Sequence, residues 1–260
     1  MLLQRFRKLN GTKMDLAAVS IKDLSFCYSR QASACLTNIN LEIKQGERFG
    51  LFGPNGAGKT TLILLMTGLM RPTSGVVKIL GQDISGTNNI KQSIGFIPQD
   101  FAFYPELSPV ENLEYFGALS GLNKLQIKAH TDELLTTLGL NEVRKNLIKT
   151  FSGGMKRRMN IAIGVINQPE ILFLDEPTMG VDVQSRLAII NYLKILNTNG
   201  VTLVYTSHHL KEAEDLCEQV ALIDEGKIIV NDGLNSLKAH HKEQELEGLF
   251  LKLTGKDFRD

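Results

Sequence analysis

Apolar and polar residues alternate with a period of two near the start of the chain, at residues 17–28 and 36–43. This alternation predicts two β-strands, each with one buried face. A short apolar run at 49–52 leads into a glycine-rich loop, and helical spacing begins at Thr60. We therefore expect a strand, a loop and a helix in succession. Short apolar runs predict two further strands, at 76–80 and 94–97.

The pattern changes between residues 105 and 168, where apolar positions recur with helical spacing and strand signals nearly disappear. Ser108-Pro109-Val110-Glu111 predicts a helix start, with serine as the N-cap, proline at the first helical position and glutamate at the third. A second helix is expected at 124–138, ended by Gly139. A third is expected to begin after residue 155 and to run to about Asn167.

Strand character returns at 171–174, where four apolar residues precede Asp175 and Glu176. A continuous apolar run of this length is typical of a central parallel strand. Helices and strands alternate in the rest of the chain, which predicts an α/β sheet. The expected elements are a helix at 184–197, a strand at 201–205, a helix at 209–217, a strand pair near 219–230, and one or two amphipathic helices in the last thirty residues.

The glycine-rich loop matches the pattern G-x-x-x-x-G-K-[ST]. Glycines let the backbone approach a polyphosphate closely, and N–H groups at a helix N-terminus attract anions. Lys59 would reach the β- and γ-phosphates of a nucleotide, and the Thr60 hydroxyl would ligate Mg²⁺. The expected phosphate-binding residues are Gly53, Pro54, Asn55, Gly56, Ala57, Gly58, Lys59, Thr60 and Thr61.

Asp175 and Glu176 end a predicted buried strand, so we expect them at the carboxyl edge of the sheet, beside the phosphate loop. Asp175 would hold Mg²⁺ directly or through water, and Glu176 would orient and deprotonate a water aimed at the γ-phosphate. The simpler alternative is ordinary strand-end polarity. The predicted fold is an α/β P-loop NTPase core with an N-terminal antiparallel β lobe and an inserted α-helical subdomain.

The composition gives no sign of an unusual environment. The chain has 260 residues, 43% of them hydrophobic, and a formal net charge of +1, so we expect no nucleic-acid partner. Cys27, Cys35 and Cys217 have no metal-ligand spacing and are expected to be reduced thiols. No apolar run approaches the roughly 18 residues of a membrane-spanning helix. Residues 1–13 are expected to form a loose tail, and Met14 offers an alternative start.

Some charged residues have no assigned chemistry. Lys156, Arg157 and Arg158 form a basic run that predicts a solvated helix face rather than a nucleic-acid site. His240 and His241 lie on an expected surface helix and are interpreted as solvated residues rather than metal ligands.

Taken together, residues 24–231 resemble the nucleotide-binding subunit of an ATP-binding cassette (ABC) transporter. FSGGM at 151–155 is similar to the family signature LSGGQ, and Met179-Gly180-Val181-Asp182 resembles the D-loop. Phe151 and Met155 replace the more common leucine and glutamine of the signature. The stretch SGGMKRRMNIAIG is similar to the branch of exporters that handles drugs, polysaccharides or sodium.

The resemblance implies roles for further residues. Gln99 stands where the family has its coupling glutamine, which touches the metal sphere and the transporter-facing surface. His208 resembles the switch histidine, which would bind the γ-phosphate and the attacking water. Tyr28 lies upstream of Gly53 where an aromatic ring stacks on adenine, although Phe26 is two residues away and faces the same side.

In the family, two subunits pair head to tail around two ATP molecules. Ser152, Gly153 and Gly154 of one subunit would cap the γ-phosphate bound to the other. Asp182 would make a contact across the dimer, with a simple helix N-cap as the alternative. The resemblance implies ATP and Mg²⁺ as cofactors, and as partners an integral membrane permease and a second nucleotide-binding subunit, either identical or related. The implied location is the cytoplasmic face of the membrane.

The expected organisation is an ABC ATPase domain at 17–235, with its helical subdomain at about 100–168, and a C-terminal helical extension at 236–260. We expect ATP hydrolysis that powers a separate permease, as part of an exporter. One alternative is a non-transport ABC ATPase in translation or DNA repair, although two cassettes, a coiled-coil insertion or zinc-binding cysteines would then be usual. A GTPase would show the guanine-reading motif N-K-x-D, and a small-molecule kinase would have no use for a signature segment. A regulatory module that holds ATP without turnover would not need Glu176 and His208.

Overall fold

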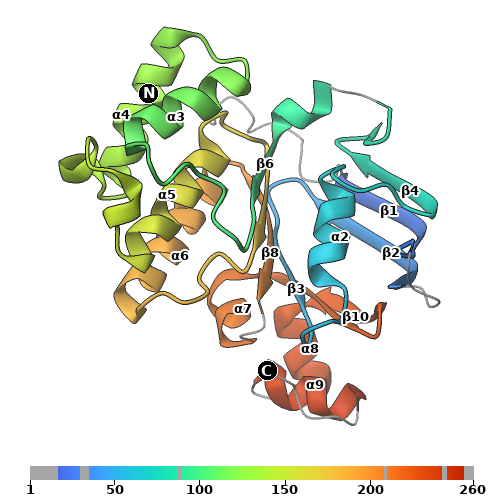
Figure 1. The fold of residues 1–260 in the computed structure, drawn as a ribbon. Helices are drawn as coiled ribbons and strands as arrows, with labels where there is room; N and C mark the ends of the chain where they lie inside the picture. Colours follow the sequence, from blue (N-terminus) through green and yellow to red (C-terminus); the bar gives the residue numbers. More distant parts are fainter. Residues whose placement is uncertain (1–16, 30–34, 87–88, 208–209, 242–244, 255–260) are drawn as a thin grey trace. The chain divides into compact units, whose positions relative to one another are not determined.

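The computed structural model describes residues 17–29, 35–86, 89–207, 210–241 and 245–254 (Figure 1). The chain divides into two compact units. Within the described residues, unit 1 comprises 92–201, and unit 2 comprises the residues before 92 and after 201. Each unit is built differently, so they are described in turn.

One sheet of unit 2 is antiparallel and four-stranded, in the order β2-β1-β4-β5. In β2, Ile39, Leu41 and Ile43 are buried and the residues between them are exposed, which confirms the predicted alternation. The strands are β1 (Ala17–Phe26), β2 (Leu36–Lys44), β4 (Ser74–Ile79) and β5 (Gln82–Asp83).

The other strands of unit 2 follow the order β10-β9-β3-β8. The strand β3 pairs in parallel with both β8 and β9, whereas β10 is antiparallel to β9. The strand β8 is buried along its whole length, and polar and apolar residues do not alternate in its burial pattern. Burial on both faces is typical of a strand inside a parallel sheet. These strands are β3 (Arg48–Phe52), β8 (Thr202–Ser207), β9 (Gln219–Asp224) and β10 (Lys227–Gly233).

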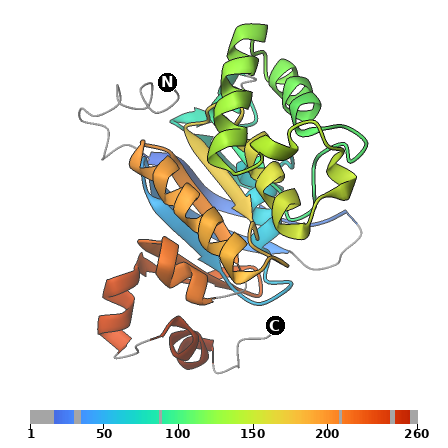
Figure 2. The same cartoon turned by 90° about the vertical axis from the view of Figure 1, so that its left-hand side faces the viewer.

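Four α-helices complete the described part of unit 2. The first, α2, contacts β4, and α8 and α9, coloured red, come after β10 in the chain (Figures 1 and 2). The apolar face of α9 is buried through Leu246, Leu249 and Phe250. The helices are α2 (Lys59–Met66), α7 (Leu210–Leu216), α8 (Leu234–His241) and α9 (Leu246–Thr254).

In its described residues, unit 1 combines four α-helices with a parallel pair of strands, β6 (Ile94–Ile97) and β7 (Ile171–Asp175). The helix α5 contacts β6, α3 and α6, so it is the element around which this unit is packed. The helices are α3 (Pro109–Leu119), α4 (Lys124–Thr137), α5 (Gly153–Val165) and α6 (Val183–Thr198). Short 3₁₀ helices, which the pattern did not predict, occur at η2 (Asn89–Ser93), η3 (Asn141–Val143) and η4 (Ile148–Thr150).

Helix ends in unit 1 agree closely with the sequence signals. The Ser108 side chain accepts a hydrogen bond from the backbone N–H of Glu111, and the Glu111 carboxylate accepts from the N–H of Ser108, as the predicted capping box requires. Gly139 follows α4 with a positive φ of 64°. One boundary was predicted wrongly, because α5 begins at Gly153, inside the 151–155 segment rather than after it.

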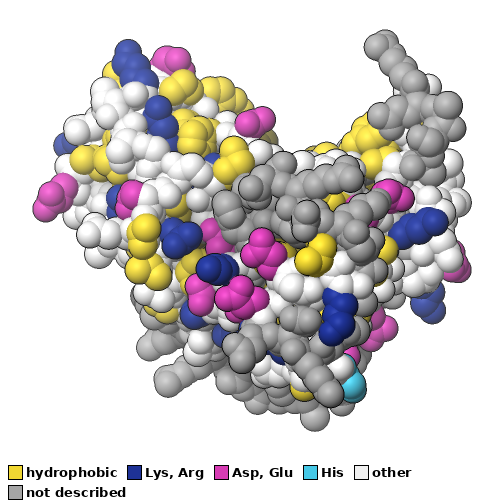
Figure 3. Space-filling view, turned by 90° about the horizontal axis from the view of Figure 1, so that it is seen from below, with side chains coloured by type: hydrophobic (Ala, Val, Ile, Leu, Met, Phe, Trp, Pro, Cys, Tyr) yellow, Lys and Arg dark blue, Asp and Glu magenta, His cyan; other side chains and the backbone are white. Residues whose placement is uncertain are grey.

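Charged side chains are interspersed on the face drawn in Figure 3, where Lys and Arg lie among Asp and Glu. Among the described helices, none combines the length and the apolar character that crossing a membrane demands. The antiparallel sheet, the parallel strands and the helices that follow β6 in the chain match the predicted fold class.

Candidate functional site

The glycine-rich loop joins β3 to α2 in unit 2. A Cβ on Gly53 would lie 2.0 Å from the carbonyl oxygen of Ile223, so the close packing of the loop on β9 demands glycine there. Gly56 and Gly58 have positive φ angles of 81° and 106°, and a Cβ on Gly56 would meet nothing within 4 Å. The loop is therefore tight where it contacts the protein and open at Gly56, which suits the approach of phosphates.

The start of α2 is left uncapped by side chains. Gly58 is its N-cap, makes no side-chain hydrogen bond, and is followed by no acidic residue in the first turn. The buried Lys59 places its Nζ inside the loop, where it donates to the carbonyl oxygens of Gly53 at 2.7 Å and Pro54 at 3.1 Å. The helix dipole and this ammonium concentrate positive charge at one place, as binding of a polyphosphate requires.

The ring predicted to hold adenine lies beside the same helix. The hydroxyl groups of Tyr28 and Thr61 are 2.9 Å apart, and the Cys35 thiol donates to the Thr61 hydroxyl at 3.6 Å. Phe26 is buried, whereas Tyr28 is 38% exposed and meets the Phe26 ring edge-on. The structure thus favours Tyr28 over Phe26 as the ring available to a ligand, and its stacking on adenine stays a prediction.

Asp175 is the last residue of β7 in unit 1 and Glu176 follows it; both are buried. Glu176 has a φ of 50°, in the left-handed region, although a proline follows it and disfavours helical angles at that position. Backbone strain of this kind costs roughly 1–3 kcal/mol and occurs mostly at functional sites. This geometry agrees with a special role for Glu176.

The signature segment starts α5. The exposed Ser152 is the N-cap, and its hydroxyl accepts a hydrogen bond from the N–H of Met155 at 3.3 Å. A Cβ on Gly154 would lie 2.3 Å from the Ser185 hydroxyl oxygen, so packing inside unit 1 demands that glycine. A Cβ on Gly153 would meet only the Gly180 carbonyl, at 3.7 Å. The packing of the described residues therefore leaves Gly153 open to an outside ligand.

Asp182 is the N-cap of α6. Its two carboxylate oxygens accept hydrogen bonds from the N–H and the hydroxyl of Ser185, at 2.9 and 2.7 Å. These bonds lower the pKa of the Asp182 carboxyl. The simpler alternative named for this residue is thus present in the single chain, and a contact across a dimer stays a prediction.

Arg157 corrects the interpretation of the basic run. It is only 3% exposed, so a solvated face is the wrong description of this residue. Its guanidinium donates to the carbonyl oxygens of Gln99 at 2.8 Å and Met179 at 3.2 Å, and lies 4.8 Å from the centre of the Phe101 ring. Helical spacing offered the missing signal, because Arg157 falls three residues after Gly154 and four before Ile161, both on the buried face of α5.

The remaining predicted residues lie in different places. The Gln99 side chain approaches the Met179 sulfur, with Nε2 3.2 Å from Sδ. Thr60 is exposed in the first turn of α2. His208 and the tail at 1–13 lie outside the described residues.

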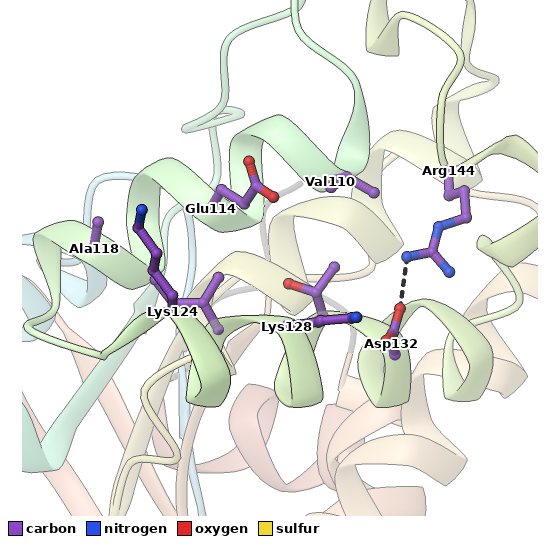
Figure 4. A pocket seen from close by; sticks show the side chains of 9 residues that line it. Val110, Glu114, Ala118, Lys124, Lys128, Asp132 and Arg144 are labelled. Carbon is purple, nitrogen blue, oxygen red and sulfur yellow. Dashed lines mark hydrogen bonds and ion pairs between the residues drawn. The ribbon is translucent and has the colours of Figure 1, made fainter.

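A hollow of about 550 Å³ lies between α3 and α4 in unit 1 (Figure 4). Its lining includes Lys124 and Lys128, and also Arg144 and Asp132, which pair with each other at 2.6 Å. Its lining contains none of the residues predicted to bind nucleotide, so this hollow is not the predicted nucleotide site.

Comparison with known proteins supports a single family. A family described as ABC transporter matches residues 36–179. The chain is 46% identical over 192 residues to the linearmycin resistance ATP-binding protein LnrL of Bacillus subtilis (strain 168), covering 74% of this chain and 62% of LnrL. It is 36% identical over 247 residues to the doxorubicin resistance ATP-binding protein DrrA of Mycobacterium tuberculosis, covering 95% of this chain and 73% of DrrA.

A third relative matches over nearly its whole length. NatA of Bacillus subtilis, an ABC transporter ATP-binding protein, is 31% identical over 90% of this chain and 96% of its own. The alignment with LnrL spans less than two thirds of that protein.

Solved structures show the same fold. An ATP-binding subunit of an ABC transporter superposes with a TM-score of 0.82 at 26% identity, covering 91% of this chain and 99% of that one. A dimeric ATP-binding cassette in a post-hydrolysis state with ADP and Pi superposes with a TM-score of 0.76 at 28% identity, covering 83% and 98%.

Proposed function

Because this chain belongs to the ABC transporter family, we propose that it binds and hydrolyses ATP to power a separate membrane permease, as a peripheral subunit on the cytoplasmic face. The uncapped start of α2, with the buried Lys59 ammonium inside the loop, carries this proposal. We further propose that residues 17–235 form the ATPase domain and 236–260 a helical extension.

The residues present fit a magnesium nucleotide. Thr60, Gln99 and Asp175 offer oxygen ligands, which Mg²⁺ prefers, and Mg²⁺ sites commonly use one or two protein ligands plus phosphates. Bound Mg²⁺ would supply positive charge against the developing charge on the phosphates. The Lys59 ammonium would leave one of its contacts to the loop carbonyls and donate to the phosphate oxygens instead.

Hydrolysis would then require a positioned base. Glu176 would accept a proton from water while the water oxygen bonds to the γ-phosphorus and the bond to the bridging oxygen breaks, releasing ADP and phosphate. The strained backbone of Glu176 would fix the carboxylate for this step. By its sequence position, His208 would hydrogen-bond the γ-phosphate.

The second ATP contact would come from a second copy or a related subunit. Ser152 already accepts from Met155, but its own hydroxyl proton is still available to donate to a phosphate. The open Gly153 would let that phosphate approach the start of α5. We propose that two chains pair head to tail, each covering the nucleotide held by the other.

The permease would dock on aromatic residues that follow Gln99. Phe101, Tyr104 and Tyr115 are each more than 40% exposed, and the rings of Tyr104 and Tyr115 pack edge to face with centres 5.1 Å apart. Exposed aromatic clusters are typical of protein interfaces. LnrL and DrrA are named for drug resistance, and another relative is named Nod factor export ATP-binding protein I. We therefore propose that the transporter works as an exporter.

Glu176→Gln tests the function. The variant keeps the shape of the side chain but removes the base, so it should bind Mg-ATP, hydrolyse it at a small fraction of the wild-type rate, and remain dimeric. Size-exclusion chromatography with ATP should show this dimer, and the double variant Lys59→Ala/Glu176→Gln should elute as a monomer. A Glu176→Gln protein that stays monomeric in saturating ATP would count against the proposal.

A further inference from the structure

One face of α5 holds the segment that contains Gln99. Asn160 is buried, donates from Nδ2 to the Pro98 carbonyl at 3.1 Å, and accepts at Oδ1 from the Ala102 N–H at 3.1 Å. Arg157, one helical turn before Asn160, donates to the Gln99 carbonyl at 2.8 Å. The backbone of 98–102 is therefore fixed to α5 at three points.

Arg157 also reaches the loop that follows Glu176. While Nη1 binds the Gln99 carbonyl, Nη2 donates to the Met179 carbonyl at 3.2 Å. The guanidinium is planar and rigid, so its two ends fix the separation of these two carbonyl groups. The Arg157 Cζ atom lies over the Phe101 ring, 4.8 Å from its centre, and this contact further restrains the guanidinium.

Burying the positive charge of Arg157 costs free energy of folding. Burial lowers the pKa of the Arg157 guanidinium, whereas the carboxylates of Asp100 and Glu176 act to raise it. The Arg157 Nε is buried and has no hydrogen-bond partner within the described part of the chain. Since a well-packed apolar side chain often stabilises a buried position as well as a charge does, stability alone is a poor reason for arginine here.

We propose that Arg157 is a positioning residue that makes the signature helix, the Gln99 segment and the loop after Glu176 move as one body during the ATP cycle. This inference rests on the proposed function. A phosphate of the partner pulling on Ser152 would shift α5, and Arg157 would carry the shift to Gln99 and Met179 together. Asn160 also binds the 98–102 segment to α5. The distinct contribution of Arg157 is its hydrogen bond to the Met179 carbonyl.

Arg157→Met and Lys156→Met form a matched pair, because each removes one positive charge from the same turn of α5. We expect Arg157→Met to lower kcat roughly tenfold or more while KM for ATP stays within about twofold, since misplacement rather than lost binding is the defect. Lys156→Met should match wild type. Arg157→Lys should be intermediate, because an ammonium lacks the fork that spans both carbonyl groups.

A spectroscopic signal separates positioning from general damage. The chain contains no tryptophan, so Phe101→Trp places a single reporter under the guanidinium. In a Phe101→Trp/Glu176→Gln background, ATP should change the tryptophan emission. The change should persist with Lys156→Met and disappear with Arg157→Met.

The outcomes separate the two proposals. A wild-type protein without ATPase activity would refute the proposed function, whatever Arg157 does. An active wild type, with Arg157→Met matching Lys156→Met in kcat and in emission, would overturn the positioning role. If Arg157→Met does not fold, Arg157→Lys decides, because wild-type kcat together with an unchanged emission response would overturn the role of the fork.

Discussion

Two helices of the described residues begin at a glycine-rich or a serine-glycine segment, and the N-termini of these two helices are capped differently. The start of α2 has Gly58 as its N-cap and no side-chain hydrogen bond. The start of α5 has Ser152 as its N-cap, which satisfies the Met155 N–H. Neither helix has an acidic residue in its first turn, so both leave their positive end available to an anion.

In our proposal, this difference makes the first a site by itself and the second half of a site. At α2, the loop backbone and the Lys59 ammonium converge on the same point. At α5 the chain already satisfies part of its own N-terminus, and Ser152 keeps a single hydroxyl proton to offer. The N-termini of α3 and α4 are capped more fully, because Ser108 and Asn123 each take part in a reciprocal capping box.

The largest effect is expected at the first helix start. Lys59→Ala removes the ammonium that the loop holds, and should lower ATP turnover by roughly 10²–10³-fold, as loss of a preorganised charge donor does. Phosphate release measures this, with the exposed Lys44→Ala of the same unit as the control. A Lys59→Ala rate within about threefold of wild type would remove the phosphate-loop assignment.

A smaller effect is expected at the second helix start. Ser152→Ala should destabilise the fold by about 1 kcal/mol through the lost cap, and should lower kcat while ATP binding to the single chain is retained. Ser108→Ala is the matched control, because it removes the cap of α3 at a similar cost without touching the proposed site. Equal ATPase rates for the two variants would show that Ser152 acts only as a cap.

The smallest effect is expected at Asp182 and depends on pH. Its hydrogen bonds with Ser185 hold the pKa of the folded carboxyl below the ordinary value of 3.8. The stabilisation should therefore be fully present above that value and be lost as pH falls through the lowered pKa. The difference in Tm between wild type and Asp182→Ala should shrink on acidification. A difference independent of pH would show that ionisation of the Asp182 carboxyl adds no stability.

Local spacing predicted the elements well where one pattern dominated. The capping box at Ser108 and the strand before Asp175 follow from residues close together in sequence. Arg157 was misinterpreted because its charged neighbours concealed its place on the buried face of α5. Its partners, Gln99 and Met179, lie far away in the sequence, and no local pattern encodes such contacts. The strain at Glu176 was equally invisible, since φ is set by the packed structure.

The direct test of the central proposal mixes two inactive variants, Lys59→Ala and Gly153→Asp. Gly153 has room for a Cβ in the chain's own fold, so the added carboxylate should repel phosphate without unfolding α5. In a head-to-tail dimer the mixed pair keeps one intact site, so the mixture should recover about a quarter of the wild-type sites. When wild type is mixed with an equal amount of the double variant, each intact segment of a mixed dimer faces a mutated one, so the mixed dimers should add no active site and only the wild-type homodimers should be active. A mixture no more active than its separate components would contradict the account.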